Sequence, residues 1–199
     1  MKLYLSPTSP FARKVRVALL EKGLVFETVF VDPWQVPAVL TRANPLSQVP
    51  TLVTDAGVAL ANSETILDWL ERAHPQPALL PPDAEAAAHA LAIAGLTQGM
   101  LEATVQIVLE RRRDAGLQSA ALIDRRKAAL ARSVDHLARH FDLARTRFQH
   151  DGIGAAVALA YLDFRLSEYE WRSTAPELAA WQDWAVTRPS LRASVPPAA

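Results

Sequence analysis

One segment constrains the fold of this chain more than any other, the run from Lys2 to Gly23. Its residues predict a short strand, a polar turn and a helix that begins at Ser9-Pro10. Serine is a preferred N-cap because its hydroxyl accepts a hydrogen bond from a first-turn amide, and proline is favoured at the first helical position. Gly23 can end the helix in the left-handed conformation. We therefore expect a strand that leads directly into a capped helix.

A second strand follows this helix. The residues from 25 to 31 are almost all β-branched or aromatic, which is typical of a strand. Two strands joined by a helix through short connections form a βαβ unit, with the strands parallel and the helix on one face. Residues 37–43 then form at most a short helix.

A hairpin and a third helix complete the first third of the chain. Residues 51–54 and 58–61 flank a turn at Gly57, which is typical of a hairpin. Ser63 then precedes an apolar face at helical spacing, residues 66–70. The predicted order of elements is therefore β-α-β-α-β-β-α.

Four prolines between positions 75 and 82 separate this region from the rest. Proline does not fit inside a helix or a central strand, so we place a linker at residues 76–82, between a domain of residues 1–75 and a domain of residues 83–199. The second domain is rich in alanine, leucine and arginine with helical periodicity. We expect it to be all-helical, with helices near residues 84–113, 120–149, 153–171 and 176–187.

The composition limits the chemistry and the partners of this protein. Its 21 basic and 21 acidic side chains balance, so no overall field attracts nucleic acid or an anionic membrane. The absence of cysteine excludes disulfides, thiolate metal ligands and a nucleophilic thiol of the protein itself. No secretory core precedes Pro7, and the uncharged apolar run at residues 152–162 is shorter than the ~20 residues that span a bilayer. We expect a cytoplasmic protein with no membrane or nucleic-acid partner.

Ser9 is the first candidate for a functional residue. A strand that feeds a helix N-terminus gathers unpaired amides and the positive end of the helix dipole, which can hold an anion or a thiolate. The same position is an ordinary N-cap, and caps are much commoner than catalytic serines. The segment by itself leaves both roles open, and capping alone is the simpler explanation.

Several motifs, taken in order, resemble those of a known family. They are Ser9-Pro10-Phe11 followed by residues 13–19, Asn44-Pro45 with Val49-Pro50, Ser63 followed by Ile66 and Trp69-Leu70, residues 160–165, and Arg188-Pro189-Ser190. Together with the order of elements, they resemble the cytosolic glutathione S-transferases, and in particular a serine-type bacterial branch. The resemblance covers essentially the whole chain. It implies a thioredoxin-like N-terminal domain followed by an all-helical C-terminal domain.

The resemblance implies a glutathione site with a role for each motif. Ser9 would be catalytic, because its hydroxyl would donate a hydrogen bond to the glutathione sulfur and favour the thiolate. Val49, held before a cis Pro50, would pair its main chain with the cysteinyl part of glutathione as an added strand would. Ser63 would bind the γ-glutamyl carboxylate. Phe11 would lie near the thiol, where pocket lining and plain packing are equally good explanations.

Two positions of this expected site depart from the usual pattern. Gln48 stands where relatives often carry a lysine or arginine that reaches the glycine carboxylate. Asn62 stands where an acidic residue or glutamine usually meets the glutathione ammonium group, and Glu64 would partly replace that charge. We therefore expect weaker glutathione binding than in a typical relative. The helix near Ile153 also lacks the usual capping box, with Asp151 as the nearest substitute cap.

The expected activity is that of a glutathione S-transferase, which conjugates glutathione with a small apolar electrophile, as in detoxification. The missing cysteine argues against the thiol-transferase and dehydroascorbate-reductase branches. A non-catalytic family member with a binding or regulatory role, and a glutathione-dependent isomerase, remain alternatives. Trp34, like Phe11, is either part of the electrophile pocket or plain packing.

We expect no metal and a homodimer. His136 and His140 share a helical face, but no further ligand completes a metal-binding pattern. The resemblance implies a homodimer in which the helices at 84–113 and 120–149 pair, across a two-fold axis, with the α/β domain of the partner. The expected partners are therefore glutathione, a small electrophile and a second copy of the chain.

Overall fold

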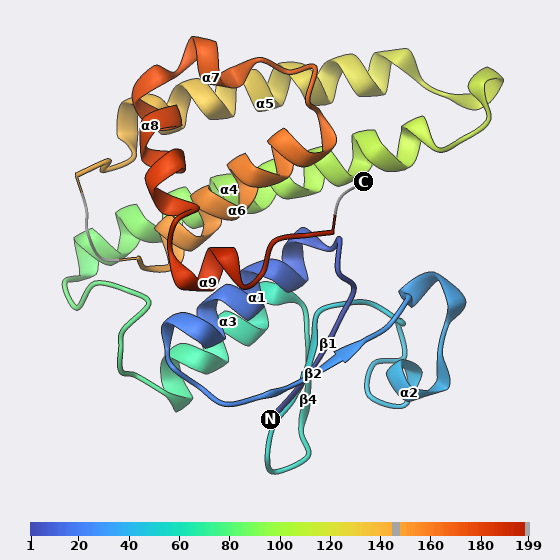
Figure 1. The fold of residues 1–199 in the computed structure, drawn as a ribbon, viewed down its shortest axis with the longest axis vertical. Helices are drawn as coiled ribbons and strands as arrows, with labels where there is room; N and C mark the ends of the chain where they lie inside the picture. Colours follow the sequence, from blue (N-terminus) through green and yellow to red (C-terminus); the bar gives the residue numbers. More distant parts are fainter. Residues whose placement is uncertain (145–147, 198–199) are drawn as a thin grey trace. The chain divides into compact units, whose positions relative to one another are not determined.

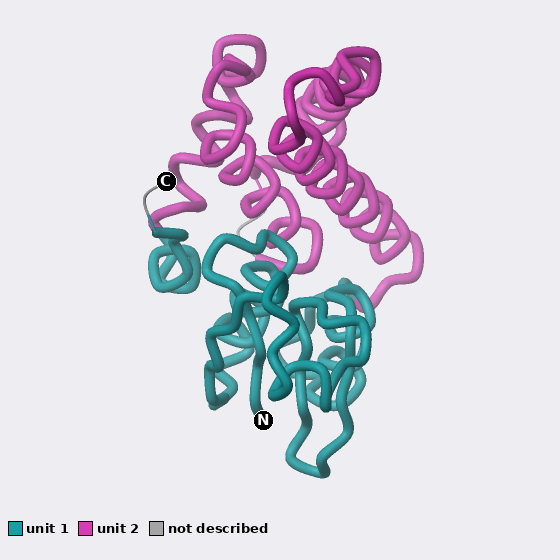
Figure 2. Tube along the Cα trace, turned by 90° about the vertical axis from the view of Figure 1, so that its right-hand side faces the viewer, with its two compact units in different colours: residues 1–81, 188–199 teal, residues 82–187 magenta. Residues whose placement is uncertain are grey.

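The computed structural model describes residues 1–144 and 148–197 (Figure 1). The chain divides into two compact units, which Figure 2 shows in teal and magenta. The first unit comprises residues 1–81 together with the segment from Arg188 onward, and the second comprises residues 82–187. This grouping differs from the predicted domain boundaries at the C-terminal end, because the segment from Arg188 onward joins the first unit.

The first unit is built on a four-stranded mixed sheet. Its strands are β1 (Lys2–Leu5), β2 (Glu27–Phe30), β3 (Thr51–Val53) and β4 (Ala59–Ala61), in the order β2-β1-β3-β4. β1 is parallel to β2 and antiparallel to β3, and β3 is antiparallel to β4. The predicted βαβ unit and hairpin are confirmed. β2 is shorter than predicted, and Val25 lies before it with 91% of its surface exposed.

Helices cover the sheet of the first unit. α1 (Pro10–Glu21) and α3 (Ser63–Ala73) lie side by side against one face, and α2 (Ala38–Thr41) lies on the other side with the 3-10 turn η1 (Pro33–Gln35) (Figure 1). Apolar side chains of the strands and of the inner helix faces form a fully buried core: Leu3, Val15, Leu19, Leu52, Ile66 and Leu70. Burial of one such side chain stabilises the fold by about 1.5–3 kcal/mol. The predicted thioredoxin-like architecture is confirmed.

A short helix, α9 (Pro189–Arg192), packs against α1 within the same unit. The carboxylate of Glu21 holds it, because it accepts hydrogen bonds from Arg188 Nη2 at 2.7 Å and Nε at 3.1 Å, and from the Ser190 hydroxyl. A bidentate contact between a guanidinium and a carboxylate fixes orientation as well as distance. The Arg188-Pro189-Ser190 motif therefore attaches the C-terminal segment to α1.

The second unit, in its described part, is helical. α4 (Ala84–Arg111) packs against α5 (Ala120–His140) and α6 (His150–Arg165), and the 3-10 turn η2 (Ala115–Leu117) joins α4 to α5. α7 (Trp171–Thr174) and α8 (Pro176–Ala185) follow α6 along the chain. By length and composition α4 would suit a membrane span, but the core helix of a soluble protein has the same properties. In this structure, 44% of its most apolar stretch is buried.

Two helices of this unit differ in their bounds from the prediction. α5 ends at His140, after which Phe141 is extended, and residues 145–147 of the predicted range lie outside the described part of the chain. α6 begins at His150 rather than near Ile153 and ends at Arg165. Its N-cap position is Gln149, so Asp151 is not the cap. Asp151 lies in the first turn, where the helix dipole favours a negative charge.

Gly154 sets how closely α6 approaches α4. A Cβ atom at this position would lie 2.3 Å from the hydroxyl oxygen of Thr97, far inside van der Waals contact. Thr97 is buried and its hydroxyl donates to the Ala94 carbonyl at 2.9 Å, so it does not simply swing away. The absence of a side chain at residue 154 is therefore a packing requirement of this helix pair.

Candidate functional site

The register of the strands brings four segments of the chain to one edge of the sheet. Tyr4 lies opposite Thr51, Thr51 lies opposite Ala61, and Leu5 lies opposite Phe30. β1, β2 and β4 therefore end where β3 begins. The segments that follow Leu5, Phe30 and Ala61 meet the segment that precedes Thr51 there. We call this end of the sheet the site edge.

All of the predicted glutathione-site residues lie on segments that reach the site edge. Ser9 and Phe11 follow β1, residues 48–50 precede β3, and residues 62–64 follow β4. The predicted set is Ser9, Phe11, Gln48, Val49, Pro50, Asn62, Ser63 and Glu64. Strand pairing thus brings together residues that are far apart in the sequence.

Ser9 caps α1, as the sequence predicts. Its backbone is extended, with φ −77° and ψ 118°, and its Oγ accepts a hydrogen bond from the Ala12 amide at 3.3 Å. The Ser9 amide donates to the Ser6 carbonyl at 3.1 Å and so closes the turn between β1 and α1. A serine hydroxyl that accepts one hydrogen bond keeps its own proton to donate. Capping is therefore compatible with a hydrogen bond to a ligand sulfur.

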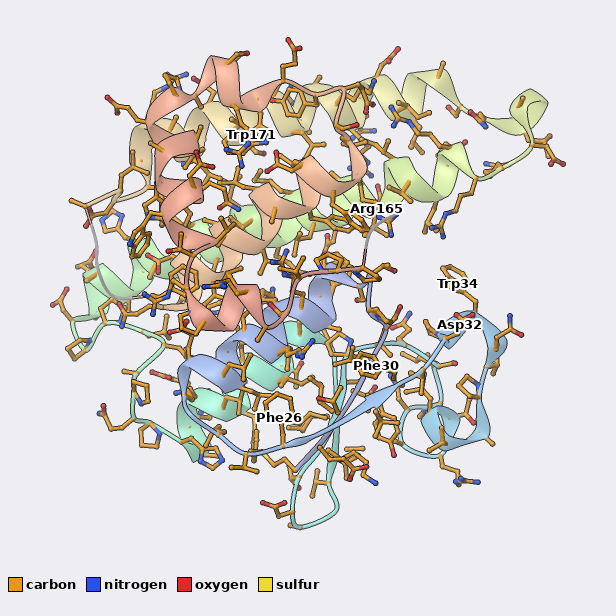
Figure 3. The ribbon with its side chains drawn as sticks, in the orientation of Figure 1. Phe26, Phe30, Asp32, Trp34, Arg165 and Trp171 are labelled. Carbon is orange, nitrogen blue, oxygen red and sulfur yellow. The ribbon has the colours of Figure 1, made fainter. Side chains whose placement is uncertain are left out.

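A pocket of about 400 Å³ opens beside Ser9, within the first unit. Side chains from the turn, from α1, from β2 and from the C-terminal segment line it, among them Ser6, Ser9, Arg13, Arg16, Phe30 and Val195. Its aromatic wall is Phe30, and neither Phe11 nor Trp34 lines it. Figure 3 shows the Trp34 ring beyond Asp32 on the segment that leaves β2, and 69% of Trp34 is exposed.

The loop before β3 is organised by a buried asparagine. The Asn44 side chain donates from Nδ2 to the Gln48 carbonyl at 3.1 Å and to Thr51 Oγ1 at 3.0 Å. Its Oδ1 accepts from the Leu46 amide at 3.1 Å, and only 3% of Asn44 is exposed. These bonds fix the backbone on both sides of Val49, so Asn44 positions this loop.

The peptide bond between Val49 and Pro50 is cis, as the motif resemblance implies. Among residues 1–144 and 148–197, the amide and the carbonyl of Val49 form no hydrogen bond. Both groups are therefore available to the main chain of a ligand, as an added strand requires. Gln48, directly before them, is exposed.

The start of α3 is capped by the residue that precedes Ser63. Asn62, not Ser63, is the N-cap, with Oδ1 accepting from the Glu64 amide at 2.9 Å. Asn62 has φ 74°, in the left-handed region that asparagine tolerates better than most residues. Ser63 is the first helical residue and only 2% exposed, so its amide and hydroxyl lie at the positive end of the helix.

The sequence did not reveal that Glu64 already has a cationic partner. The Nζ of Lys14 on α1 forms an ion pair with Glu64 Oε1. The Lys14 side chain is 1% exposed and the Glu64 side chain 39% exposed, so the pair joins the interior to the surface. This ion pair offsets part of the negative charge of Glu64, which reduces its attraction for a ligand ammonium group.

Two arginines line the pocket, a role that was not predicted for them from the sequence. Arg13 and Arg16 lie one helical turn apart on α1. Arg13 donates from Nη2 to the Leu191 carbonyl at 3.3 Å and from Nε to Ser194 Oγ at 3.4 Å. Burial, and then the positive charge of Arg16, lower the pKa of Arg13 to about 10. Both lie in the segment that resembles the family motif, but their spacing of three residues fits a solvated helix face equally well.

The described residues contain no group of three or more histidine, aspartate or glutamate side chains that could hold a metal ion. His136 and His140 do lie on one face of α5, with ring centroids 4.3 Å apart, and both are exposed.

Comparisons with known proteins bear on the whole chain. Residues 3–78 match the family model of the glutathione S-transferase N-terminal domain. The sequence is 33% identical to the uncharacterized GST-like protein YibF of Escherichia coli K12 over 202 residues, which cover 100% of both chains. A glutathione S-transferase from Methylobacterium radiotolerans JCM 2831, solved with glutathione sulfonate, is 38% identical. The match covers 100% of this chain and 95% of that one, with a TM-score of 0.92.

A second solved structure carries a larger ligand. It is a glutathione transferase family member from Pseudomonas fluorescens Pf-5, solved with bound S-(propanoic acid)-glutathione. Its sequence is 33% identical to this one. The match covers 99% of this chain and 100% of that one, with a TM-score of 0.86.

The thioredoxin-like sheet, the helical second unit and the end-to-end sequence matches define one class of protein. This chain belongs to the cytosolic glutathione S-transferase family. The family that the motifs suggested is thus confirmed, while its serine-type branch stays a prediction.

Proposed function

We propose that this protein is a glutathione S-transferase that conjugates the thiolate of glutathione with a small electrophile, and that Ser9 stabilises that thiolate. One observation carries the proposal: the Ser9 hydroxyl stands at the N-terminus of α1, on the site edge, beside a pocket of about 400 Å³. The relative solved with glutathione sulfonate supports it. A cytoplasmic homodimer with a role in detoxification is the setting that the family resemblance favours.

Ser9 acts on the sulfur through two effects. Its hydroxyl donates a charge-assisted hydrogen bond to the thiolate, and the positive end of α1 adds to the attraction. A hydrogen bond to a charged group stabilises it by about 1.5–3 kcal/mol. Because 1.36 kcal/mol corresponds to one pH unit, the pKa of the thiol falls by about 1–2 pH units. The thiolate then attacks the electrophilic carbon, and the leaving group departs with its electron pair as the carbon–sulfur bond forms.

The rest of glutathione lies along the site edge in this proposal. The open amide and carbonyl of Val49 pair with the cysteinyl part, and the amide and hydroxyl of Ser63 hold the γ-glutamyl carboxylate. The glycine carboxylate meets the neutral Gln48. The ammonium group meets Glu64, whose charge a buried lysine already offsets. The affinity for glutathione is therefore expected to be lower than in a typical relative.

Turnover of 1-chloro-2,4-dinitrobenzene with glutathione tests the role of Ser9. The Ser9→Ala variant should lose about 10- to 100-fold in kcat/KM, because one charge-assisted hydrogen bond to the thiolate is gone. Ser119→Ala is the matched control, since Ser119 caps α5 in the same way, with Oγ accepting from the Leu122 amide at 3.2 Å. This control removes a helix cap and should leave turnover unchanged.

Two results would contradict this proposal. Equal rates for the wild type and Ser9→Ala would remove Ser9 from the mechanism, and equal losses in Ser9→Ala and Ser119→Ala would reduce it to a cap. Calorimetry with millimolar glutathione addresses the non-catalytic alternative. Binding without turnover would favour that alternative, and no binding would remove glutathione from the proposal.

A further inference from the structure

The pocket beside Ser9 has a positive charge. Arg13 and Arg16 line it, and none of its lining residues is acidic. The other walls are apolar or uncharged, with Leu5 and Phe30 on the side of the sheet. Both guanidinium groups belong to partly buried side chains, where a charge is less well hydrated than on an open surface.

Neither arginine is paired with a carboxylate within residues 1–144 and 148–197. Arg13 donates only to a carbonyl and a hydroxyl, at 3.3 and 3.4 Å, and Arg16 forms no hydrogen bond or ion pair there. Arg188, in the same unit, is by contrast held bidentately by Glu21. Within the described residues, Arg188 thus has a carboxylate partner that attaches the C-terminal segment, whereas the two arginines of the pocket have none.

Two like charges so close oppose each other. After burial, the positive charge of Arg16 is the second cause that lowers the pKa of Arg13. An anion between them would relieve this repulsion and gain charge-assisted hydrogen bonds from both forks. Among the described residues, the pocket therefore offers two cationic side chains and no acidic side chain to pair with them.

The pocket also has a direction. Ser9 begins α1, and Arg13 and Arg16 follow four and seven residues later, which places them on one helical face. At 1.5 Å per residue, seven residues advance about 10 Å along the helix. The lining residues of α1 thus extend from Ser9, at the proposed position of the thiolate, to Arg16 further along the helix, with the apolar Leu5 and Phe30 also in the lining.

We infer that the second substrate is an electrophile with an apolar body and a carboxylate, which Arg16 and Arg13 bind while the thiolate beside Ser9 attacks. This inference rests on the proposed function and specifies its substrate class. For an aryl chloride the balance is simple: the thiol proton goes to solvent, the carbon–sulfur bond forms, and the carbon–chlorine bond breaks with release of chloride.

Two probes of equal shape test the carboxylate. They are 4-chloro-3-nitrobenzoate and 4-chloro-3-nitrobenzamide, and each kcat/KM is divided by the rate constant of the same probe with glutathione alone. The wild type should prefer the benzoate by about tenfold or more, because a hydrogen bond to a charged group is worth roughly that factor. Arg16→Gln should remove most of this preference, and Arg16→Lys should restore part of it.

Arg42→Gln is the matched control, since Arg42 is exposed on the same unit and does not line the pocket. It removes the same charge and should keep the wild-type preference. An unchanged preference in Arg16→Gln, or an equal loss in Arg42→Gln, would overturn the inference. So would an equal loss of affinity for glutathione alone in Arg16→Gln, because the anion would then be a carboxylate of glutathione itself.

A failure of the proposed function has a different signature. If the wild type turns over both probes with no preference for the benzoate, the transferase proposal stands and the inference fails. If the wild type turns over neither probe, calorimetry with S-(4-carboxy-2-nitrophenyl)glutathione and its carboxamide decides. Tighter binding of the carboxylate by wild type, lost in Arg16→Gln, would support the inference, and equal or absent binding would overturn it.

Discussion

Two serines begin helices in the same way in this protein but have different surroundings. Ser9 Oγ accepts from the Ala12 amide, and Ser119 Oγ accepts from the Leu122 amide, in each case three residues on. At α5 the protein supplies the anion itself, because the carboxylate of Glu110 accepts from the Ser119 amide at 2.7 Å. At α1 a pocket opens beside the serine, and none of the described residues that line it is acidic.

This difference shows what turns a helix cap into a candidate site. The amides and the dipole at a helix N-terminus favour a negative charge wherever it comes from. At α5 the carboxylate of Glu110 provides this negative charge. The amide of Ser119, together with Arg113, lowers the pKa of Glu110. At α1 no acidic side chain of the described residues lines the pocket beside the cap. The cap is the same local device in both places, and the surroundings decide its use.

Among the variants that test this comparison, the largest effect on stability is expected from Asn44→Ala. This variant alters the loop before β3 at the site edge and leaves the Ser9 cap intact. The variant removes the donor that holds the Gln48 carbonyl and Thr51 in place. Loss of these buried bonds should lower the free energy of unfolding by about 2 kcal/mol and weaken glutathione binding severalfold. Thermal unfolding and calorimetry measure the two effects.

Gln118→Ala is the counterpart near the other serine. Its side-chain amide donates to the carbonyls of Arg111 and Arg113 at 3.2 and 2.8 Å, at the turn before α5. It should cost less stability, because Gln118 is exposed, and leave glutathione binding at the wild-type value. Equal losses of glutathione affinity in both variants would show that the surroundings of Ser9 are not special.

A smaller effect, with a defined pH dependence, is expected from Glu110→Gln. The folded protein holds the pKa of Glu110 below its ordinary value of 4.5, so the unfolded chain takes up the proton more readily. The stabilisation is therefore present above about pH 4.5 and is lost as the pH falls through the lower folded pKa. At pH 7 the melting temperature of Glu110→Gln should be lower than that of the wild type, and this difference in melting temperature should shrink as the pH falls.

Glu102→Gln on the same helix is the control for this measurement, because Glu102 is exposed and its carboxylate contacts Gln98 rather than the start of α5. It should shift the melting temperature less. A Glu110→Gln difference that persists unchanged at pH 3 would contradict the internal anion at α5, and with it the contrast to Ser9.

The smallest effect is expected from Gln48→Lys at the site edge. A lysine there would supply a positive charge that pairs with the glycine carboxylate of glutathione, and an exposed ion pair contributes about 0.2–1 kcal/mol. Glutathione affinity should rise by about two- to fivefold at low salt, and the gain should fade as ionic strength increases. Gln35→Lys, an exposed change of equal charge on η1, should produce no such gain. No gain in Gln48→Lys would argue against this orientation of glutathione.

The sequence predicted the architecture of the first unit well because its signals are local. Ser9-Pro10 at the start of α1, the β-branched run of β2 and the turn at Gly57 each fix their own backbone within a few residues. The bounds of α6 were less accurate, since no capping box marks its start and its N-cap is Gln149. Weak local signals give uncertain ends.

Within the candidate site, the motif positions were predictable and their partners were not. Ser9, Val49 and Ser63 came from short patterns, whereas the ion pair of Lys14 with Glu64 joins residues on two different helices. No periodicity or spacing reveals such a pair, because both residues also suit an ordinary solvated helix face.

The sequence by itself determined that a capped helix follows the first strand, that the chain has no thiol of its own, and that a cis proline motif precedes the third strand. Only the tertiary structure decided that Ser9, Val49 and Ser63 reach one edge of the sheet, because the register of β1, β3 and β4 is set by pairing between distant segments. The tertiary structure also decided which helix N-terminus meets a carboxylate of the protein and which lies beside a pocket. Glu110 reaches the serine of α5, and a pocket with two arginines stands beside the serine of α1.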